Sequence, residues 1–188
     1  MNNRRVFIAI NFPEQVKNRL LKYQDQWADM SMRWTRKDNL HLTLVFIGYV
    51  TDDEMLEICQ LAKEIGQKHQ PFEINFDKIC LGPPNRPPRM IWITGQPVVQ
   101  LAQLRNDLEK TIFNSKEVDF KGSGYKLFNP HITLARFGQN QLWPKGQKLE
   151  VDQKIDLAIP VETIEVMESH ISRGGAEYSV LETIDLGL

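Results

Sequence analysis

The sequence predicts an α+β fold with mostly antiparallel sheets, built as two similar lobes within one domain over residues 1–188. Three observations predict this fold. The first two thirds of the chain alternate strand-like and helix-like patterns, the last third is rich in strand-like alternation, and a motif at residue 41 returns at residue 131. We expect the helices on the outside, and the two repeated strands lining a central cleft in a pseudo-twofold arrangement.

The N-terminal part of the chain favours one strand followed by a helix, and later a second helix. Residues 6–11 form an apolar, strand-like run, and Pro13 is suited to the first turn of a helix. Apolar side chains then recur at helical spacing, at Val16, Leu20, Tyr23 and Trp27. Thr51 and Glu54 match a capping box that begins a helix. The face of this second helix is predicted to hold Met55, Cys59, Ala62 and Ile65.

The remaining elements are two extended segments, a third helix and three strands. The extended segments lie within 72–95 and flank a proline-rich stretch at 82–89, which indicates an exposed connection. A helix over 98–113 would turn Leu101, Leu104, Leu108 and Ile112 inward. Alternation over 149–159 predicts a half-buried strand. Segments 161–172 and 177–186 are predicted to pair as a hairpin around 173–175.

Composition limits the classes of function. The formal net charge of -1 argues against a broad positive surface for long nucleic acids and mildly favours short or terminal substrates. Cys59 and Cys80 lack CxxC spacing and are expected to be packed thiols. The short apolar run near the N-terminus leads into Pro13 rather than a cleavage site, so the cytoplasm is the expected compartment. No run of apolar residues is long enough to predict a membrane span.

The most informative feature is a motif that occurs twice. Residues 41–48 read HLTLVFIG and residues 131–138 read HITLARFG, so His, Thr, Leu and Gly recur at the same four places. Successive side chains on a strand point to opposite faces. Each motif therefore offers an imidazole and a hydroxyl on one face, and buries two aliphatic side chains on the other.

Two imidazoles on opposite sides of a phosphate suit the cleavage of a phosphodiester. One histidine can accept a proton from the attacking oxygen while the other gives a proton to the leaving oxygen, because imidazole titrates near neutral pH. His41 and His131 are therefore the predicted catalytic residues. The hydroxyls of Thr43 and Thr133 are predicted to donate to the phosphate oxygens.

Metal binding is the competing interpretation of paired histidines. Zinc sites use three or four protein ligands, usually with a spaced Cys, Asp or Glu, and threonine is a poor ligand. We therefore expect neither a metal nor another cofactor. His69 and His170 stand in no matching context and are expected to be surface or partly buried residues.

The sequence resembles the two-histidine phosphoesterase superfamily, and within it the RNA 2',3'-cyclic phosphodiesterases once called 2'-5' RNA ligases. The resemblance rests on FIAINFP at 7–13, NLHLTLVFIG at 39–48, NPHITLAR at 129–136, and Tyr178 ahead of the last strand. It implies metal-independent hydrolysis of a 2',3'-cyclic phosphate, on an RNA end or a nucleotide, to a 2'-phosphomonoester. It also implies that His41 gives a proton to the leaving 3' oxygen and that His131 activates water.

The resemblance extends to Arg136, which matches an arginine that often follows the second motif and would bind a phosphate oxygen. Strict alternation places Arg136 on the face opposite His131, so it reaches the site only if the strand twists, ends or bulges there. The alternative is that Arg136 forms a structural ion pair. Phe7 could stack on a nucleobase, although a core position is favoured for an aromatic residue in an early strand. Arg33 and Trp34 are likewise interpreted as surface charge and packing.

Two other functions stay open at this point. The same cleft could bind a nucleotide or RNA end without turnover, or it could join RNA ends through a 2'-5' bond by the reverse reaction. We expect a monomer without an obligate protein partner and without membrane attachment.

Overall fold

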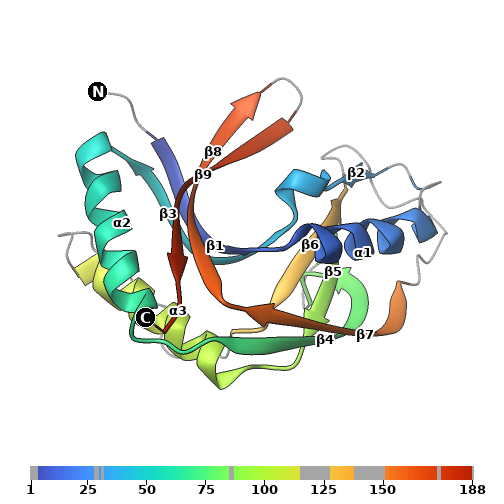
Figure 1. The fold of residues 1–188 in the computed structure, drawn as a ribbon. Helices are drawn as coiled ribbons and strands as arrows, with labels where there is room; N and C mark the ends of the chain where they lie inside the picture. Colours follow the sequence, from blue (N-terminus) through green and yellow to red (C-terminus); the bar gives the residue numbers. More distant parts are fainter. Residues whose placement is uncertain are drawn as a thin grey trace.

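A computed structural model describes residues 4–27, 30, 32–84, 87–114, 128–137, 151–172 and 175–187. Within these residues the chain forms two antiparallel sheets (Figure 1). The four-stranded sheet has the order β3-β1-β8-β9 and the five-stranded sheet has the order β2-β6-β5-β4-β7. The predicted α+β fold with antiparallel sheets is confirmed.

The element bounds agree closely with the sequence patterns. The four-stranded sheet consists of β1 (Arg4–Asn11), β3 (His41–Val50), β8 (Thr163–Ser172) and β9 (Gly175–Asp185). The five-stranded sheet consists of β2 (Arg33–Trp34), β4 (Phe72–Gly82), β5 (Met90–Gly95), β6 (His131–Arg136) and β7 (Asp152–Val161). The helices are α1 (Glu14–Gln24), α2 (Asp52–Gly66) and α3 (Val99–Asn114), with 3-10 turns η1 (Asp25–Trp27) and η2 (Lys37–Asn39).

Local sequence signals explain where the helices begin and which face they bury. The capping box at the start of α2 is present, since the Thr51 hydroxyl accepts from the Glu54 amide while the Glu54 carboxylate accepts from the Thr51 amide. The four inward residues predicted for α3 are fully buried, at Leu101, Leu104, Leu108 and Ile112. On α1 the buried face carries two polar residues beside Leu20, namely Lys17 and Gln24.

The fold repeats one unit, strand-helix-strand, in its two halves. In β1-α1-β3 and in β5-α3-β6 the two strands are antiparallel neighbours joined through a helix. The sheet orders also correspond, because β3-β1-β8-β9 matches β6-β5-β4-β7 strand for strand. The two predicted lobes are thus the two sheets, and each contributes one of the repeated motifs.

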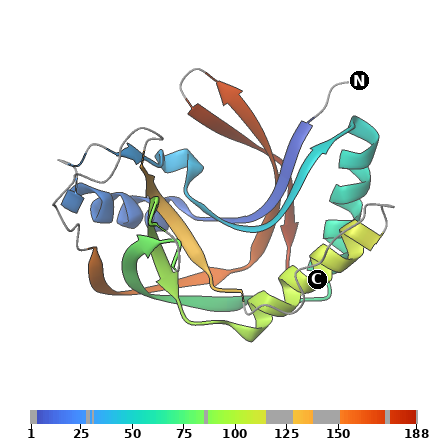
Figure 2. The ribbon, with the colours of Figure 1, turned by 180° about the vertical axis from the view of Figure 1, so that it is seen from behind.

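The helices of the two repeats are exchanged between the halves. Helix α1 follows β1 but packs against β6, and α3 follows β5 but packs against β3. Both ribbon views place α1 at one side of the molecule, and α2 and α3 at the other (Figures 1 and 2). One hydrophobic core continues through both halves, and β3 lies against β6 where the halves meet.

The other face of the four-stranded sheet has a much smaller apolar cluster. It contains Phe7, Ala9 and Met167, with Tyr178 partly buried against them. Phe7 and Tyr178 of this cluster lie against the ring of His41. Among the described residues, no helix is both long and apolar enough to cross a membrane.

Candidate active site

Both repeated motifs contain a β-bulge at the same place. In β3, Thr43 pairs with Ala9 and Val45 pairs with Ile8, so Leu44 is an extra residue. In β6, Thr133 pairs with Trp92 and Ala135 pairs with Ile91, so Leu134 is the extra residue. The burial patterns of residues 41–46 and 131–136 are identical as a result.

The bulge reverses the alternation of side chains beyond it. After His41 and Thr43, the exposed Phe46 returns to their face, and after His131 and Thr133 the exposed Arg136 does the same. The expectation from strict alternation, that Arg136 lies on the opposite face, is therefore wrong. One of the three conditions named for its approach to the site, a bulge in this strand, is met.

The ring of His41 is fixed by a carbonyl, a hydroxyl and two aromatic rings. Nδ1 lies 2.8 Å from the Asn39 carbonyl oxygen, which can only accept, so Nδ1 carries the proton in the neutral ring. The Thr43 hydroxyl, 2.9 Å from Nε2, then donates to it. Phe7 and Tyr178 have ring centroids 5.2 and 5.1 Å from that of the imidazole. His41 consequently presents Nε2 on the side of Thr43.

His131 has the same backbone contact and a different aromatic neighbour. Its Nδ1 lies 3.2 Å from the Asn129 carbonyl oxygen, again two residues earlier in the chain. Trp92 lies against the imidazole with a centroid distance of 4.2 Å and an interplanar angle of 33°. The tryptophan ring covers Gly82, where a Cβ atom would come within 2.3 Å of it. Only glycine leaves room for this stacking.

Burial and positive charge lower the pKa of both imidazoles. Burial is the main cause that lowers the pKa of His41 to about 4, and the charges of Arg136, Lys17 and His131 lower it further. The pKa of His131 is lowered too, first by burial and then by Arg136. In both rings the backbone hydrogen bond opposes the shift. Because Arg136 acts on both histidines, and His131 acts on His41, these three residues share one electrostatic environment.

The predicted site residues occupy corresponding places on β3 and β6. His41, Thr43, His131 and Thr133 are all partly exposed, so solvent reaches them. The structure does not test the roles that the sequence predicts for these residues and for Arg136, and those roles stay predictions. The shared glycine of the second motif, Gly138, lies outside the described residues.

Several aromatic residues of the site were not predicted as such. Trp92 and Phe46 carried no role in the sequence interpretation, and Tyr178 entered only through the family resemblance. Phe46 could have been recognised, because it occupies the place in the first motif that Arg136 occupies in the second. Its side chain is 68% exposed, unlike that of Phe7, which is 3% exposed and confirms the core position expected for it.

Two ionisable side chains near His41 were also missed. Lys17 is buried on α1, and its charge lowers the pKa of His41 and of Glu165. Burial raises the pKa of Glu165, which hydrogen bonds to Asn11. Glu165 pairs with Ala9 on the next strand, and so lies on the same sheet as Thr43. No motif links these residues in sequence, since only folding brings α1 and β8 together.

The other residues considered in the sequence lie outside the two motifs. As expected, Arg33 is exposed and Trp34 packs on the core. Both belong to β2, which pairs with β6. Cys59 and Cys80 are free, partly buried thiols. His170 is exposed, and His69 pairs with Asp107 at 3.0 Å. Among the described residues, no three His, Cys, Asp or Glu side chains gather in a way that could hold a metal ion.

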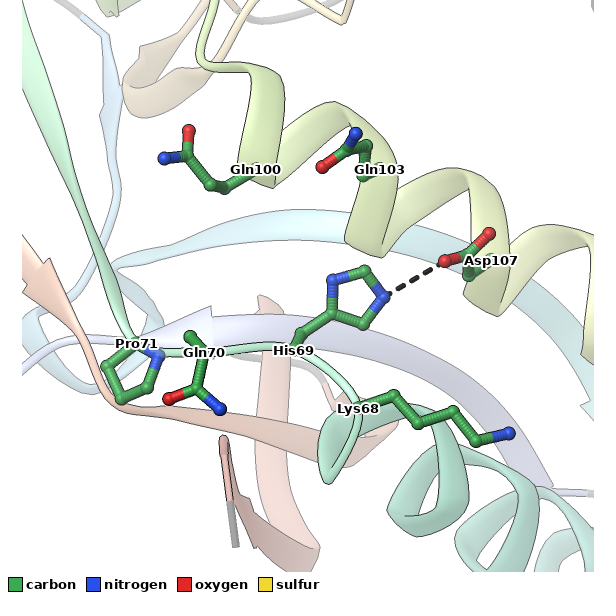
Figure 3. A pocket seen from close by; sticks show the side chains of 7 residues that line it. All are labelled: Lys68, His69, Gln70, Pro71, Gln100, Gln103 and Asp107. Atoms are coloured by element: carbon green, nitrogen blue, oxygen red, sulfur yellow. Dashed lines mark hydrogen bonds and ion pairs between the residues drawn. The ribbon is translucent and has the colours of Figure 1, made fainter.

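A cavity of about 520 Å³ lies between α3 and the segment that follows α2 (Figure 3). It is lined by residues 68–71, which follow α2, and by Gln100, Gln103 and Asp107 of α3. Figure 3 shows the His69–Asp107 pair spanning this space. None of these residues belongs to β3 or β6, so the cavity is separate from the candidate active site.

Known proteins resemble this chain in sequence and in fold. The family described as LigT like Phosphoesterase matches residues 10–92, which include the first motif. The RNA 2',3'-cyclic phosphodiesterase of Methanocaldococcus jannaschii is 28% identical over 95% of this chain and 98% of its own length. The enzyme of the same name from Aquifex aeolicus is 26% identical over 82% of each chain.

Solved structures share the fold over nearly the whole chain. The protein TT0787 of Thermus thermophilus superposes with a TM-score of 0.82 at 25% identity, covering 97% of this chain and 98% of its own. E. coli LigT in its apo form gives a TM-score of 0.79 at 24% identity, over 100% of both chains. At 24% identity, the likeness to E. coli LigT is one of fold alone.

The chain therefore resembles the LigT-like phosphoesterases, in sequence over residues 10–92 and in fold over nearly its whole length.

Proposed function

We propose that this chain is an RNA 2',3'-cyclic phosphodiesterase that converts a terminal 2',3'-cyclic phosphate to a 2'-phosphomonoester without a metal ion. The observation that carries the proposal is the duplicated geometry of the two motifs. In each, Nδ1 is bound to a backbone carbonyl, so Nε2 is the atom that would exchange a proton with the substrate. Nε2 of His41, which accepts from the Thr43 hydroxyl in the free protein, would turn its proton to the substrate once it is protonated. Two relatives with this enzyme name, which match 95% and 82% of the chain, support this choice.

The proposed reaction assigns one proton transfer to each histidine. Neutral His131 takes a proton from water through Nε2 as the water oxygen bonds to phosphorus. The bond from phosphorus to O3' breaks, and protonated His41 gives its Nε2 proton to that oxygen. The product keeps the phosphate on O2'. Each of these transfers is worth roughly 10²- to 10⁴-fold in rate.

The neighbours of the histidines would bind the phosphate. Thr43 and Thr133 lie two residues after the histidines, on the same face, and their hydroxyls can donate to its oxygens. Arg136 supplies a fixed positive charge on that face, where its Nη1 lies 2.9 Å from Met90 Sδ. A guanidinium can donate two parallel hydrogen bonds to a phosphate. The charge of the transition state would thus be matched by fixed donors.

The substrate class follows from an apolar feature of the same face. Phe46 is 68% exposed beside the buried Phe7, with the two ring centroids 6.1 Å apart. An exposed aromatic ring beside a phosphate site suits a nucleobase, which stacks regardless of its sequence. An RNA end or a nucleotide therefore fits this face better than a simple phosphate ester does.

The test is hydrolysis of a nucleoside 2',3'-cyclic phosphate by purified protein in excess EDTA, with chromatographic identification of the product. His41→Ala and His131→Ala should each lose about 10²-fold or more in kcat while remaining folded. His170→Ala is the matched control, because this histidine is exposed and outside the site, and it should retain full activity.

Each other outcome points to a different function. A 3'-phosphomonoester as product would mean that O2', and not O3', is the leaving oxygen. Inactivation by EDTA would mean that the reaction needs a metal ion. Saturable nucleotide binding without turnover by the wild-type protein would make the chain a binding module. Formation of 2'-5' linked products from RNA ends with a 5' hydroxyl would show that the same site also runs the reverse reaction.

A further inference from the structure

The carbonyl groups of the two bulged residues are held by side chains from the exchanged helices. Gln24 on α1 donates from Nε2 to the Leu134 carbonyl oxygen at 3.1 Å. Arg105 on α3 donates from Nε to the Leu44 carbonyl oxygen at 3.1 Å. The two contacts join equivalent places, because Leu44 and Leu134 are the extra residues of the two motifs.

A bulge needs such partners for a physical reason. The extra residue has no pairing partner on the neighbouring strand, β1 for Leu44 and β5 for Leu134, so its backbone groups depend on partners from elsewhere. A buried carbonyl without a partner destabilises the folded state. At Leu134 the partners are Gln24 and the Thr35 amide, which lies 2.8 Å from the carbonyl oxygen. Gln24 also donates to the Thr35 carbonyl oxygen at 2.9 Å, so it joins both segments.

The position of the bulge decides which residues reach the catalytic face. Without the extra residue at Leu134, strict alternation would turn Arg136 toward α1 and the core. Without the extra residue at Leu44, Phe46 would turn in the same way. Gln24 is itself only 7% exposed, and Arg105 is fixed further by an ion pair with Glu109 and by the Phe128 ring 4.8 Å away. Both side chains are therefore held firmly enough to fix the position of the bulged carbonyl that each one contacts.

We propose that Gln24 and Arg105 are positioning residues, which act on the substrate through the residue that each bulge directs. Gln24 holds Arg136 in place for the phosphate, and Arg105 holds Phe46 in place for the base. This inference rests on the proposed function. Each half of the protein thereby sets the substrate contact of the other half, since each helix packs on the motif strand of the opposite sheet.

A double-mutant cycle distinguishes positioning from a general contribution to stability. Gln24→Met keeps the length of the side chain and removes the amide donor. It should lower kcat/KM for a nucleoside 2',3'-cyclic phosphate about tenfold in the wild-type background. In the Arg136→Ala background it should change kcat/KM less than twofold, because the contact that it positions is already gone. Arg105→Met should cost the same factor in both backgrounds.

The measurements distinguish failure of the positioning proposal from failure of the proposed function. A Gln24→Met effect of equal size in both backgrounds overturns the proposal, and so does wild-type kcat/KM in the folded variant. If Gln24→Met does not fold, Gln24→Asn takes its place in the cycle, since its amide is one methylene too short to reach the carbonyl. If the wild-type protein shows no hydrolysis, the proposed function fails. The cycle is then read from the affinity for inorganic phosphate, by calorimetry, with the same two criteria.

Discussion

Binding of an anion at the motif face should be coupled to the uptake of one proton by His41. The free protein holds this ring neutral near pH 7, because burial and nearby positive charges lower its pKa to about 4. The proposed reaction needs His41 protonated when it meets the leaving oxygen. A bound anion can raise the pKa of His41 again, since a negative charge stabilises the imidazolium. Sulfate is a suitable probe, because its own charge does not change over the pH range of interest.

The size of the effect can be estimated from two energies. Returning the pKa of His41 from about 4 to its ordinary value of 6.5 requires about 3.4 kcal/mol, from roughly 1.36 kcal/mol per unit. Two unit charges about 4 Å apart interact by about 4 kcal/mol at an effective dielectric constant of roughly 20. A single negative charge in contact with the ring is therefore sufficient. The doubly charged sulfate exceeds this requirement.

The sign of the pH dependence follows from the direction of the shift. Between pH of about 4 and about 6.5 His41 is neutral in the free protein and protonated in the complex, so uptake approaches one proton. The affinity for sulfate should rise as the pH falls through this window and level off below the pKa of the free ring. Above pH of about 7.5 the coupling fades, because neither form holds the proton.

Calorimetry of sulfate binding at pH 5.5, in two buffers with different ionisation enthalpies, measures the proton uptake directly. His41→Gln should abolish the uptake, and His170→Gln should leave it unchanged. The reasoning is refuted if sulfate binds without proton uptake at this pH. It is also refuted if His41→Gln retains the full uptake, since the proton would then go to His131 and the two roles would be exchanged.

Two substitutions test the aromatic residues of the site. Gly82→Ala places a Cβ atom 2.3 Å from the Trp92 ring and should force that ring away from His131, at about 1–3 kcal/mol in the free energy of unfolding and with a lower kcat. Gly66→Ala creates a similar overlap, at 2.6 Å, away from the site and should lose stability only, so equal kcat in the two variants would contradict this role for Trp92. Phe46→Leu should lower kcat/KM for an oligonucleotide ending in a cyclic phosphate about 5- to 100-fold, with unchanged stability because the ring is 68% exposed; unchanged kcat/KM would exclude stacking on this ring.

Local patterns in the sequence were sufficient to predict most of the fold. The capping box at Thr51, the leucine spacing over 98–113 and the alternation of the C-terminal strands are short-range signals, and each matches the structure. The repeat of HxTL was sufficient to place His41 and His131 on equivalent strands. These features depend on neighbours a few residues apart or on exact repetition, which a single sequence displays.

The exchange of helices between the halves could not be predicted in this way. Nothing in the sequence of α1 indicates that Gln24 reaches Leu134, or that Lys17 lies near His41 and Glu165. These contacts join segments more than 100 residues apart, or arise only when a helix packs on the sheet of the opposite half. A polar residue on the apolar face of a predicted helix was the one available signal, and α1 carries two of them.

The bulges, by contrast, do leave a trace in the sequence. An alternating strand would follow Leu44 and Leu134 with an outward, polar residue, yet Val45 and Ala135 are apolar and buried. Two successive apolar residues after an alternating HxT indicate an extra residue in the strand, and therefore a change of face for the next side chain. The pattern predicts the orientation of Arg136 without coordinates.

The residues that follow the two bulges suggest how two nearly identical motifs could bind one substrate asymmetrically. The proposed in-line displacement needs two imidazoles on opposing sides of the phosphate, of which one acts as acid and the other as base. The identical residues of the motifs cannot make that distinction. It must come from the places where the halves differ: Phe46 against Arg136 after the bulge, and Tyr178 with Phe7 against Trp92 beside the rings. An aromatic residue on one side and a cation on the other would orient a nucleotide with its base toward β3 and its phosphate charge toward β6, and this orientation fixes which histidine meets the leaving oxygen.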